Sequence, residues 1–142
     1  SISYLIEASR KAEIRNRETI IEKLSNHINS SCKDPSEVLY VGLSYKANVG
    51  DIRSSVAYEI ALEMNKNYLG INFYDPLVSA ENINALRVID SIDDCIKKIS
   101  TVIIMVNHDV FDFKTILYGV DYIFDSQNVV SSQRIGKEVI LL

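Results

Sequence analysis

From about residue 37 onward, short apolar runs alternate with amphipathic stretches, and this alternation constrains the fold more than any other feature. The apolar runs occupy residues 38–42, 71–74, 85–88, 101–106, 122–124 and 139–142. The stretches between them, residues 54–68, 79–85, 92–99 and 110–118, carry apolar residues at helical spacing. Runs without polar alternation are typical of strands buried on both faces, and the helices between parallel strands form right-handed crossovers. The pattern therefore predicts an α/β fold with a doubly wound, mostly parallel sheet of five to six strands.

Residues 2–29 follow a different pattern, because they contain neither Gly nor Pro and their apolar residues recur at helical spacing. These apolar residues are Ile2, Leu5, Ile6, Ala8, Ala12, Ile14, Ile20, Ile21 and Leu24. The segment predicts one long N-terminal helix of about 25 residues ahead of the sheet. Its apolar stripe needs a partner, so we expect a homodimer through this helix or a contact with a domain upstream. The helix starts without a clear N-cap, so we also expect that the chain is cut from a longer protein.

Charge and composition exclude several classes of function. The net charge is −4 at pH 7 and the Lys and Arg residues are dispersed, whereas binding to duplex nucleic acid depends on clustered cations. The longest apolar run is far shorter than the roughly 18 residues that span a bilayer, and no signal-peptide pattern opens the chain. We therefore expect a cytoplasmic protein that binds neither nucleic acid nor a membrane.

The two cysteines, Cys32 and Cys95, lie far apart in the sequence and form no CxxC motif. No histidine stands near either of them at the spacing of a metal site. We interpret both as reduced structural thiols, and we predict no metal centre.

Polar residues follow the predicted strands at segments 44–48, 75–76, 107–109 and 125–128. In doubly wound sheets, ligands bind in the crevice beyond the carboxyl ends of the strands. These four segments are therefore the candidate ligand-binding region. The alternative role of the aspartates among them is to cap turns or helices.

The loop after the first strand stands where a dinucleotide-binding fingerprint would lie, but it has no GxGxxG motif. Gly42 and Gly50 are too far apart to form the usual pyrophosphate turn. The domain is therefore not expected to bind NAD by itself. The loop instead carries Tyr45, Lys46 and Arg53, an aromatic ring and two cations that suit a nucleotide diphosphate.

The alternative for these two cations is a purely structural role. Lys46 would then be a solvated surface residue, and Arg53 would pair with Asp51 or Glu59. Spacing alone leaves both interpretations open.

Four segments, in order along the chain, resemble motifs of the UDP-glucose/GDP-mannose dehydrogenase family. The run GLSYKANVGDIRSS at residues 42–55 resembles the signature that opens the family's C-terminal UDP-sugar-binding domain. FYDPLV at 73–78, NHDVF at 107–111 and DSQN at 125–128 are similar to its later strand-end motifs. The resemblance spans nearly the whole chain. Among family members, the sequence most resembles those that act on UDP-N-acetyl sugars, such as UDP-N-acetylmannosamine dehydrogenase.

The resemblance implies an NAD-dependent oxidation of a sugar C6 alcohol to a carboxylate, with UDP-sugar as substrate. In the family, a cysteine in a Gly-rich upstream segment forms the covalent intermediate, and a separate N-terminal domain binds NAD. Neither Cys32 nor Cys95 stands in such a context. The resemblance therefore implies half of an active site, with no catalytic residue in these 142 residues and no activity of the fragment alone.

Residue by residue, the resemblance implies that Tyr45 and Lys46 contact the UDP-sugar. It implies that Arg53 reaches toward the NAD cofactor held by the missing N-terminal domain. Residues 1–29 resemble the end of the central helix that joins the family's two nucleotide domains and forms its dimer, and residues 30–142 the UDP-sugar-binding domain.

Four further residues are candidate crevice residues: Asn48, Asp75, His108 and Gln127. The alternative for Asp75 is to hold the turn at its strand end, and for His108 to cap the following helix. Gln127 stands where the family usually has Arg, so one expected cation is absent and the substrate is left open.

Two other classes of function remain as alternatives. A non-catalytic nucleotide-binding or dimerisation module that has lost its catalytic halves is favoured by Gln127 in place of Arg. A response-regulator-like signalling domain shares the doubly wound architecture but needs clustered acidic residues early in the chain. Only Asp34 and Glu37 precede the first predicted strand closely.

Overall fold

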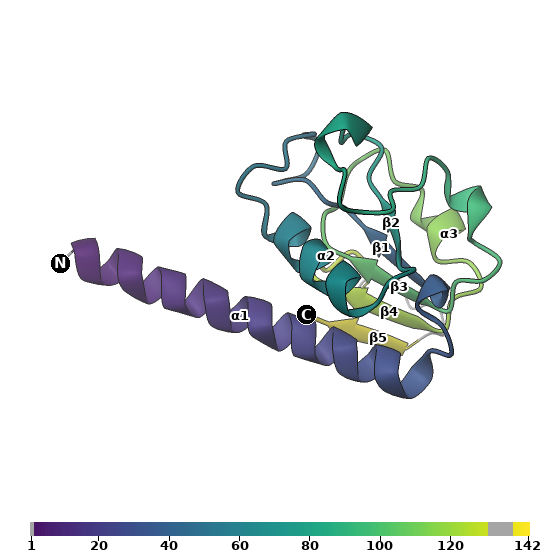
Figure 1. Cartoon of the computed structure of the whole chain (residues 1–142), viewed down its shortest axis with the longest axis horizontal. Helices are drawn as coiled ribbons and strands as arrows, with labels where there is room; N and C mark the ends of the chain where they lie inside the picture. The colour runs from purple at the N-terminus through teal and green to yellow at the C-terminus, as the bar shows by residue number, and fades with distance from the viewer. Residues whose placement is uncertain (1, 131–137) are drawn as a thin grey trace.

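The computed structural model describes residues 2–130 and 138–142, without the side chains of residues 6, 7, 9–15 and 82. Its elements, drawn in Figure 1, are helices α1 (Ile2–Ser31), α2 (Val56–Asn67) and α3 (Phe113–Ile116), strands β1 (Val38–Val41), β2 (Asn72–Tyr74), β3 (Thr101–Ile104), β4 (Tyr122–Asp125) and β5 (Glu138–Leu141), and the single-turn 3₁₀ helices η1 (Pro35–Glu37), η2 (Ala80–Asn82) and η3 (Ile92–Asp94).

The five strands form one sheet in the order β2-β1-β3-β4-β5, and every neighbouring pair is parallel. The predicted parallel sheet of five to six strands is therefore confirmed. β1 lies between β2 and β3, so the chain leaves β1 toward one side and returns on the other. In doubly wound sheets, ligands bind beyond the carboxyl ends of the strands at such a reversal, which here lies at β1 and β3.

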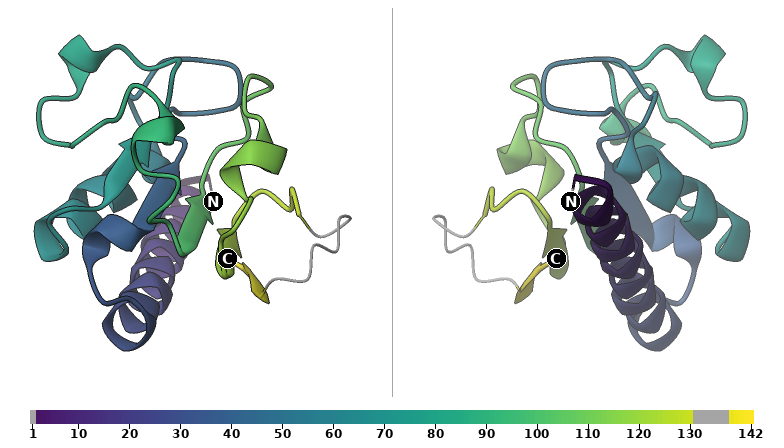
Figure 2. Two further views of the ribbon diagram at one scale, coloured as in Figure 1. Left: turned by 90° about the vertical axis from the view of Figure 1, so that its right-hand side faces the viewer. Right: turned by 90° about the vertical axis from the view of Figure 1, so that its left-hand side faces the viewer.

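Layers of helix and turn cover both faces of the sheet, as Figure 2 shows. Tyr40, Phe73 and Ile103 belong to the apolar cluster that includes α1 and α2. Leu39 and Ile104 belong to the second cluster, with α3 and the segment around η3. Because successive residues of a strand point to opposite faces, β1 and β3 are buried at every position, and all of their residues except Thr101 are apolar.

The expected strand at 85–88 is wrong. Its link to the sheet is a single bridge between Phe73 and Val88, in which the Phe73 N–H donates to the Arg87 carbonyl at 3.2 Å. β2 is only three residues long, and Arg87 is exposed, so the segment does not become a further strand.

The four expected helices also differ in length. The stretches at 79–85 and 92–99 form only the single turns η2 and η3, because segments this short need tertiary packing to complete a helix. The helix predicted over 110–118 is reduced to α3, whose start is fixed by Asp112 accepting from the Thr115 N–H. α2 begins after Ser55, whose hydroxyl accepts the Tyr58 N–H at 3.1 Å, so Ser55 caps this helix.

α1 is the predicted long helix, and its two halves have different surroundings. Ile20, Leu24 and Ile28 are buried against the domain, so the expectation of an exposed stripe over residues 2–24 is wrong for Ile20 and Leu24. The N-terminal half projects beyond the rest of the fold in Figure 1, with Tyr4 and Leu5 exposed. The side chains of Ile6, Ala12 and Ile14 lie outside the described residues. None of the described helices is long and apolar enough to span a membrane.

We expect Leu24→Ala to lower the free energy of unfolding by about 3 kcal/mol, because it deletes a side chain that is only 1% exposed between α1 and the domain. The matched control is Leu5→Ala in the projecting half, where the side chain is 64% exposed and the expected change is below about 0.5 kcal/mol. Chemical denaturation at low micromolar protein measures both. Equal effects of the two substitutions would contradict the packing of α1.

Candidate functional site

Two glycines let the loop between β1 and α2 lie directly against neighbouring strand ends. Gly42 has a φ of +94°, and a Cβ there would lie 2.6 Å from the Val106 Cβ beyond β3. A Cβ at Gly50 would lie 2.1 Å from the Leu77 carbonyl oxygen beyond β2. Any side chain at these positions would clash, so the loop needs Gly at both places.

The carboxylate of Asp75, whose side chain is fully buried, holds the beginning of this loop. Its Oδ2 accepts the backbone N–H groups of Leu43 at 2.8 Å and Ser44 at 3.2 Å. Its Oδ1 accepts the Leu77 N–H at 3.0 Å, so Asp75 also holds the turn after β2. The turn-holding alternative for Asp75 is therefore what the structure shows.

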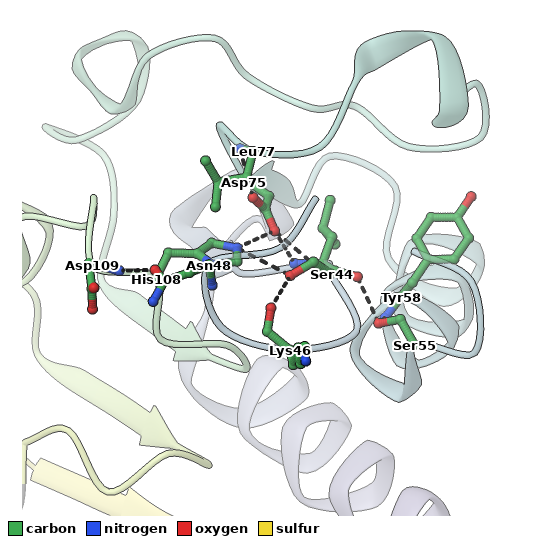
Figure 3. Close-up of polar contacts among 10 residues, drawn as sticks. Ser44, Lys46, Asn48, Ser55, Tyr58, Asp75, Leu77, His108 and Asp109 are labelled. Carbon is green, nitrogen blue, oxygen red and sulfur yellow. Dashed lines mark hydrogen bonds and ion pairs between the residues drawn. The ribbon is translucent and has the colours of Figure 1, made fainter. Parts of the chain in front are cut away.

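His108, at the end of the segment after β3, is buried beside Asp75, as Figure 3 shows. Its Nε2 lies 3.0 Å from Asp75 Oδ2 and 3.3 Å from Ser44 Oγ. Its Nδ1 accepts the Asn48 N–H at 2.8 Å, and Asn48 Oδ1 accepts the Asp109 N–H at 2.8 Å. Three of the candidate crevice residues, Asn48, Asp75 and His108, therefore form one connected network. His108 is not a helix cap.

Tyr45 and Lys46 lie on the exposed part of the loop, while their backbone is held. The Ser44 hydroxyl donates to the Lys46 carbonyl at 2.9 Å, and the Tyr45 N–H donates to the Asp51 carbonyl at 2.7 Å. The Tyr45 side chain is 58% exposed, and Lys46 is exposed as well. The loop thus presents an aromatic ring and a cation to solvent from a fixed backbone.

Arg53 pairs with Asp51, one of the two structural alternatives. Its Nη2 donates to Asp51 Oδ2 at 2.8 Å and its Nε to Oδ1 at 3.1 Å. These bonds, followed by the bond from the Arg53 backbone N–H, lower the pKa of the Asp51 carboxyl to about 2. The Arg53 side chain is 87% exposed and lines a hollow of about 460 Å³ with Tyr45, Asp51 and Ser54. The other candidate partner, Glu59, pairs with Arg17 on α1.

Gln127 lies apart from this network, beyond β4. Asp125 accepts the N–H groups of Gln127 and Val130, both at 2.9 Å, and so holds the turn. The Gln127 side chain donates only to Ser126, at 3.1 Å to the hydroxyl, among the described residues. The structure therefore does not bring Gln127 to the other candidates.

A larger hollow of about 870 Å³ lies between α1 and α2, but its lining does not suit a nucleotide. Four glutamates, Glu18, Glu22, Glu59 and Glu63, stand around it against two cations, Arg17 and Lys66. A diphosphate would be repelled there. The loop after β1, with Lys46 and Arg53, remains the better site for an anion.

Neither cysteine lies in an environment that favours a reactive thiolate. Burial raises the pKa of both the Cys32 and the Cys95 thiol, which disfavours the reactive thiolate. Within residues 2–130 and 138–142, no group of three or more His, Cys, Asp or Glu could hold a metal ion. Ser44 and Asp109 lie within the candidate segments 44–48 and 107–109, but the sequence alone assigned neither of them a place in the network. Asn48 has a left-handed φ of +64°, and only its residue type, which tolerates this conformation, is visible in the sequence.

Residues 39–132 match the model of the UDP-glucose/GDP-mannose dehydrogenase family, UDP binding domain. The chain belongs to this family. The match begins in β1 and includes the loop with Tyr45 and Lys46, the turn at Asp75 and the segment at His108. No curated protein sequence matches the chain.

Solved structures of three dehydrogenases are similar to the chain. They are the UDP-N-acetyl-mannosamine dehydrogenase Cap5O from Staphylococcus aureus (25% identity, TM-score 0.66, 88% of this chain and 29% of that one), the UDP-D-ManNAc dehydrogenase from Pyrococcus horikoshii (21%, 0.60, 83% and 28%) and the GDP-mannose dehydrogenase from Pseudomonas aeruginosa (17%, 0.52, 91% and 29%). The last two show the fold alone. The chain thus spans less than a third of the length of each relative.

We predict that the Asp51 carboxyl titrates with a midpoint of about pH 2, below the ordinary 3.8. Because the pKa is lower in the folded state, the contact with Arg53 stabilises the fold above about pH 3.8, and this contribution is lost as the pH falls through about 2. Carboxyl-carbon NMR measures the midpoint, which should rise part of the way toward 3.8 in Arg53→Ala. A midpoint near 3.8 in the wild-type chain would contradict the ion pair.

Proposed function

We propose that this chain is the C-terminal UDP-sugar-binding domain of an NAD-dependent nucleotide-sugar 6-dehydrogenase. The observation that carries the proposal is the loop after β1, where a family-matched segment exposes Tyr45 and Lys46 beyond the carboxyl end of β1. The parent enzyme oxidises a UDP-hexose or UDP-N-acetylhexosamine to its uronic acid. Residues 1–29 are the end of its central helix and residues 30–142 its substrate domain.

The proposed substrate is a UDP-N-acetyl sugar, and UDP-N-acetylmannosamine is the leading candidate. Its support is the similarity to Cap5O, a protein described as a UDP-N-acetyl-mannosamine dehydrogenase. In this assignment, the Lys46 ammonium binds the diphosphate and the Tyr45 ring packs against the nucleotide. Arg53 remains paired with Asp51 at the end of the loop, and from there it faces the cofactor of the adjoining domain.

The residues after β1 do not fit an NAD site of their own. In a dinucleotide-binding turn, backbone N–H groups after the first strand point at the pyrophosphate. Here the N–H groups of Leu43 and Ser44 donate hydrogen bonds to Asp75 Oδ2, at 2.8 and 3.2 Å. NAD is therefore assigned to the N-terminal domain of the parent protein, and the isolated chain is expected to be inactive.

We further propose a cytoplasmic homodimer that associates through the projecting half of α1. Ile2, Tyr4 and Leu5, which are 77%, 70% and 64% exposed, supply the apolar contact. Sedimentation equilibrium tests this: the wild-type chain dimerises and Leu5→Glu shifts it to monomer. A wild-type chain that stays monomeric at high micromolar concentration would contradict the dimer.

The second candidate is a non-catalytic nucleotide-binding or dimerisation module. Gln127 in place of the family's Arg favours it, because a cation expected near the ligand is absent. An NAD-binding domain and a Gly-flanked cysteine encoded upstream in the same gene would exclude this candidate.

We expect Lys46→Ala to weaken UDP binding by at least about tenfold, because it removes a charge-assisted contact to phosphate. Chemical-shift titration with UDP detects the weak affinity of half a site. The matched control is Lys66→Ala, an exposed lysine in the last turn of α2, before the amino end of β2. Its UDP affinity should equal that of the wild-type chain. Unchanged affinity in Lys46→Ala would overturn the assignment.

We also expect Gln127→Arg to strengthen UDP binding several-fold, because it restores the cation that the family usually carries beyond β4. The same titration measures it. An affinity that is unchanged or reduced in the folded variant would count in favour of the non-catalytic module.

A further inference from the structure

A buried histidine joins the two ends of the segment that carries Tyr45 and Lys46. On one side, His108 Nε2 lies 3.3 Å from the Ser44 hydroxyl. On the other side, His108 Nδ1 accepts the backbone N–H of Asn48 at 2.8 Å. The three residues between these contacts, 45–47, are all exposed. The imidazole therefore spans the base of a short exposed loop, as Figure 3 shows.

The contacts of His108 define a single protonation form. Nδ1 accepts a hydrogen bond from a backbone N–H, so it carries no proton, and the ring proton lies on Nε2. The Nε2–H group then donates to Asp75 Oδ2 at 3.0 Å. The Ser44 hydroxyl gives its own hydrogen to the Lys46 carbonyl, so its oxygen faces Nε2–H as a second acceptor. The neutral Nε2–H tautomer satisfies every one of these contacts.

His108 has no direct route to a ligand. Its side chain is 0% exposed, and its ring packs against Phe111 with 5.0 Å between the ring centroids. Its influence on binding has to pass through the loop. Asn48 is the residue of the loop that depends most on these contacts, because its φ of +64° is sparsely populated for residues other than Gly. Its backbone N–H donates to His108, and its side chain accepts the N–H of Asp109.

We propose that His108 is a positioning residue for UDP binding, which holds Ser44 and Asn48 so that Tyr45 and Lys46 are ordered before the nucleotide arrives. Ordering the loop in advance reduces the entropy lost when these side chains bind. This inference rests on the proposed function for the identity of the ligand. The role of the imidazole in ordering the loop is independent of it.

Two substitutions each keep one half of the imidazole's hydrogen bonding. His108→Asn retains an acceptor near the Nδ1 position, and His108→Gln retains a donor near the Nε2 position. We expect each folded variant to bind UDP about tenfold more weakly than the wild-type chain, with faster backbone motion of residues 45–47 in NMR relaxation. The matched control is His27→Gln. His27 lies at the amino end of β3, where its Nε2 contacts the Thr101 hydroxyl. This substitution should leave both readouts unchanged.

A measurement on the wild-type chain keeps the test decisive if both variants fail to fold. Nitrogen NMR of the His108 ring should show a proton on Nε2 and an unprotonated Nδ1, and a proton on Nδ1 would overturn the proposal. Folded variants with wild-type UDP affinity and wild-type loop motion would also overturn it. If the wild-type chain binds no UDP at all, the proposed function fails, and the loop motion of the variants still decides the positioning role.

Discussion

The hydrogen bonds of the buried Asp75 carboxylate hold the loops at the carboxyl ends of the strands, and the rest of the candidate site depends on them. The carboxylate accepts N–H groups from Leu43 and Ser44 after β1 and from Leu77 in its own turn, and it contacts the His108 imidazole after β3. A carboxylate without these donors would be costly to bury, so the burial of Asp75 and the path of the loop require each other. One side chain thereby connects the ends of three adjacent strands.

The consequence for function is a loop with a fixed base and an exposed tip. Its first N–H groups are committed to Asp75, which removes the phosphate cradle of a dinucleotide site. Its exposed side chains, Tyr45 and Lys46, remain available to a ligand. Burial disfavours the thiolate of Cys32 and Cys95, and the groups that the loop exposes are an aromatic ring and a cation. Such a surface fits a family domain whose match covers UDP binding alone.

The sequence predicted the parallel sheet because strands buried on both faces are apolar at nearly every position, as β1 and β3 are with the single exception of Thr101. It failed at residues 85–88, where an apolar run meets a strand too short to extend the ladder. The clustering of the polar residues that follow the strands was predictable, since the carboxyl ends of parallel strands lie on the same side of a sheet. The partners were not, because the pairing of Asn48 with His108, 60 positions apart, depends on strand register and on a left-handed backbone.

The central claim is that Asp75 and His108 hold the loop in place without any ligand, and amide hydrogen exchange of the nucleotide-free chain tests it most directly. The N–H groups of Leu43, Ser44 and Asn48, which donate to these two side chains, should exchange far more slowly than that of Ala47 in the same loop. Comparable exchange at all four residues would contradict the claim, because it would mean that the loop opens freely and is ordered only by its ligand.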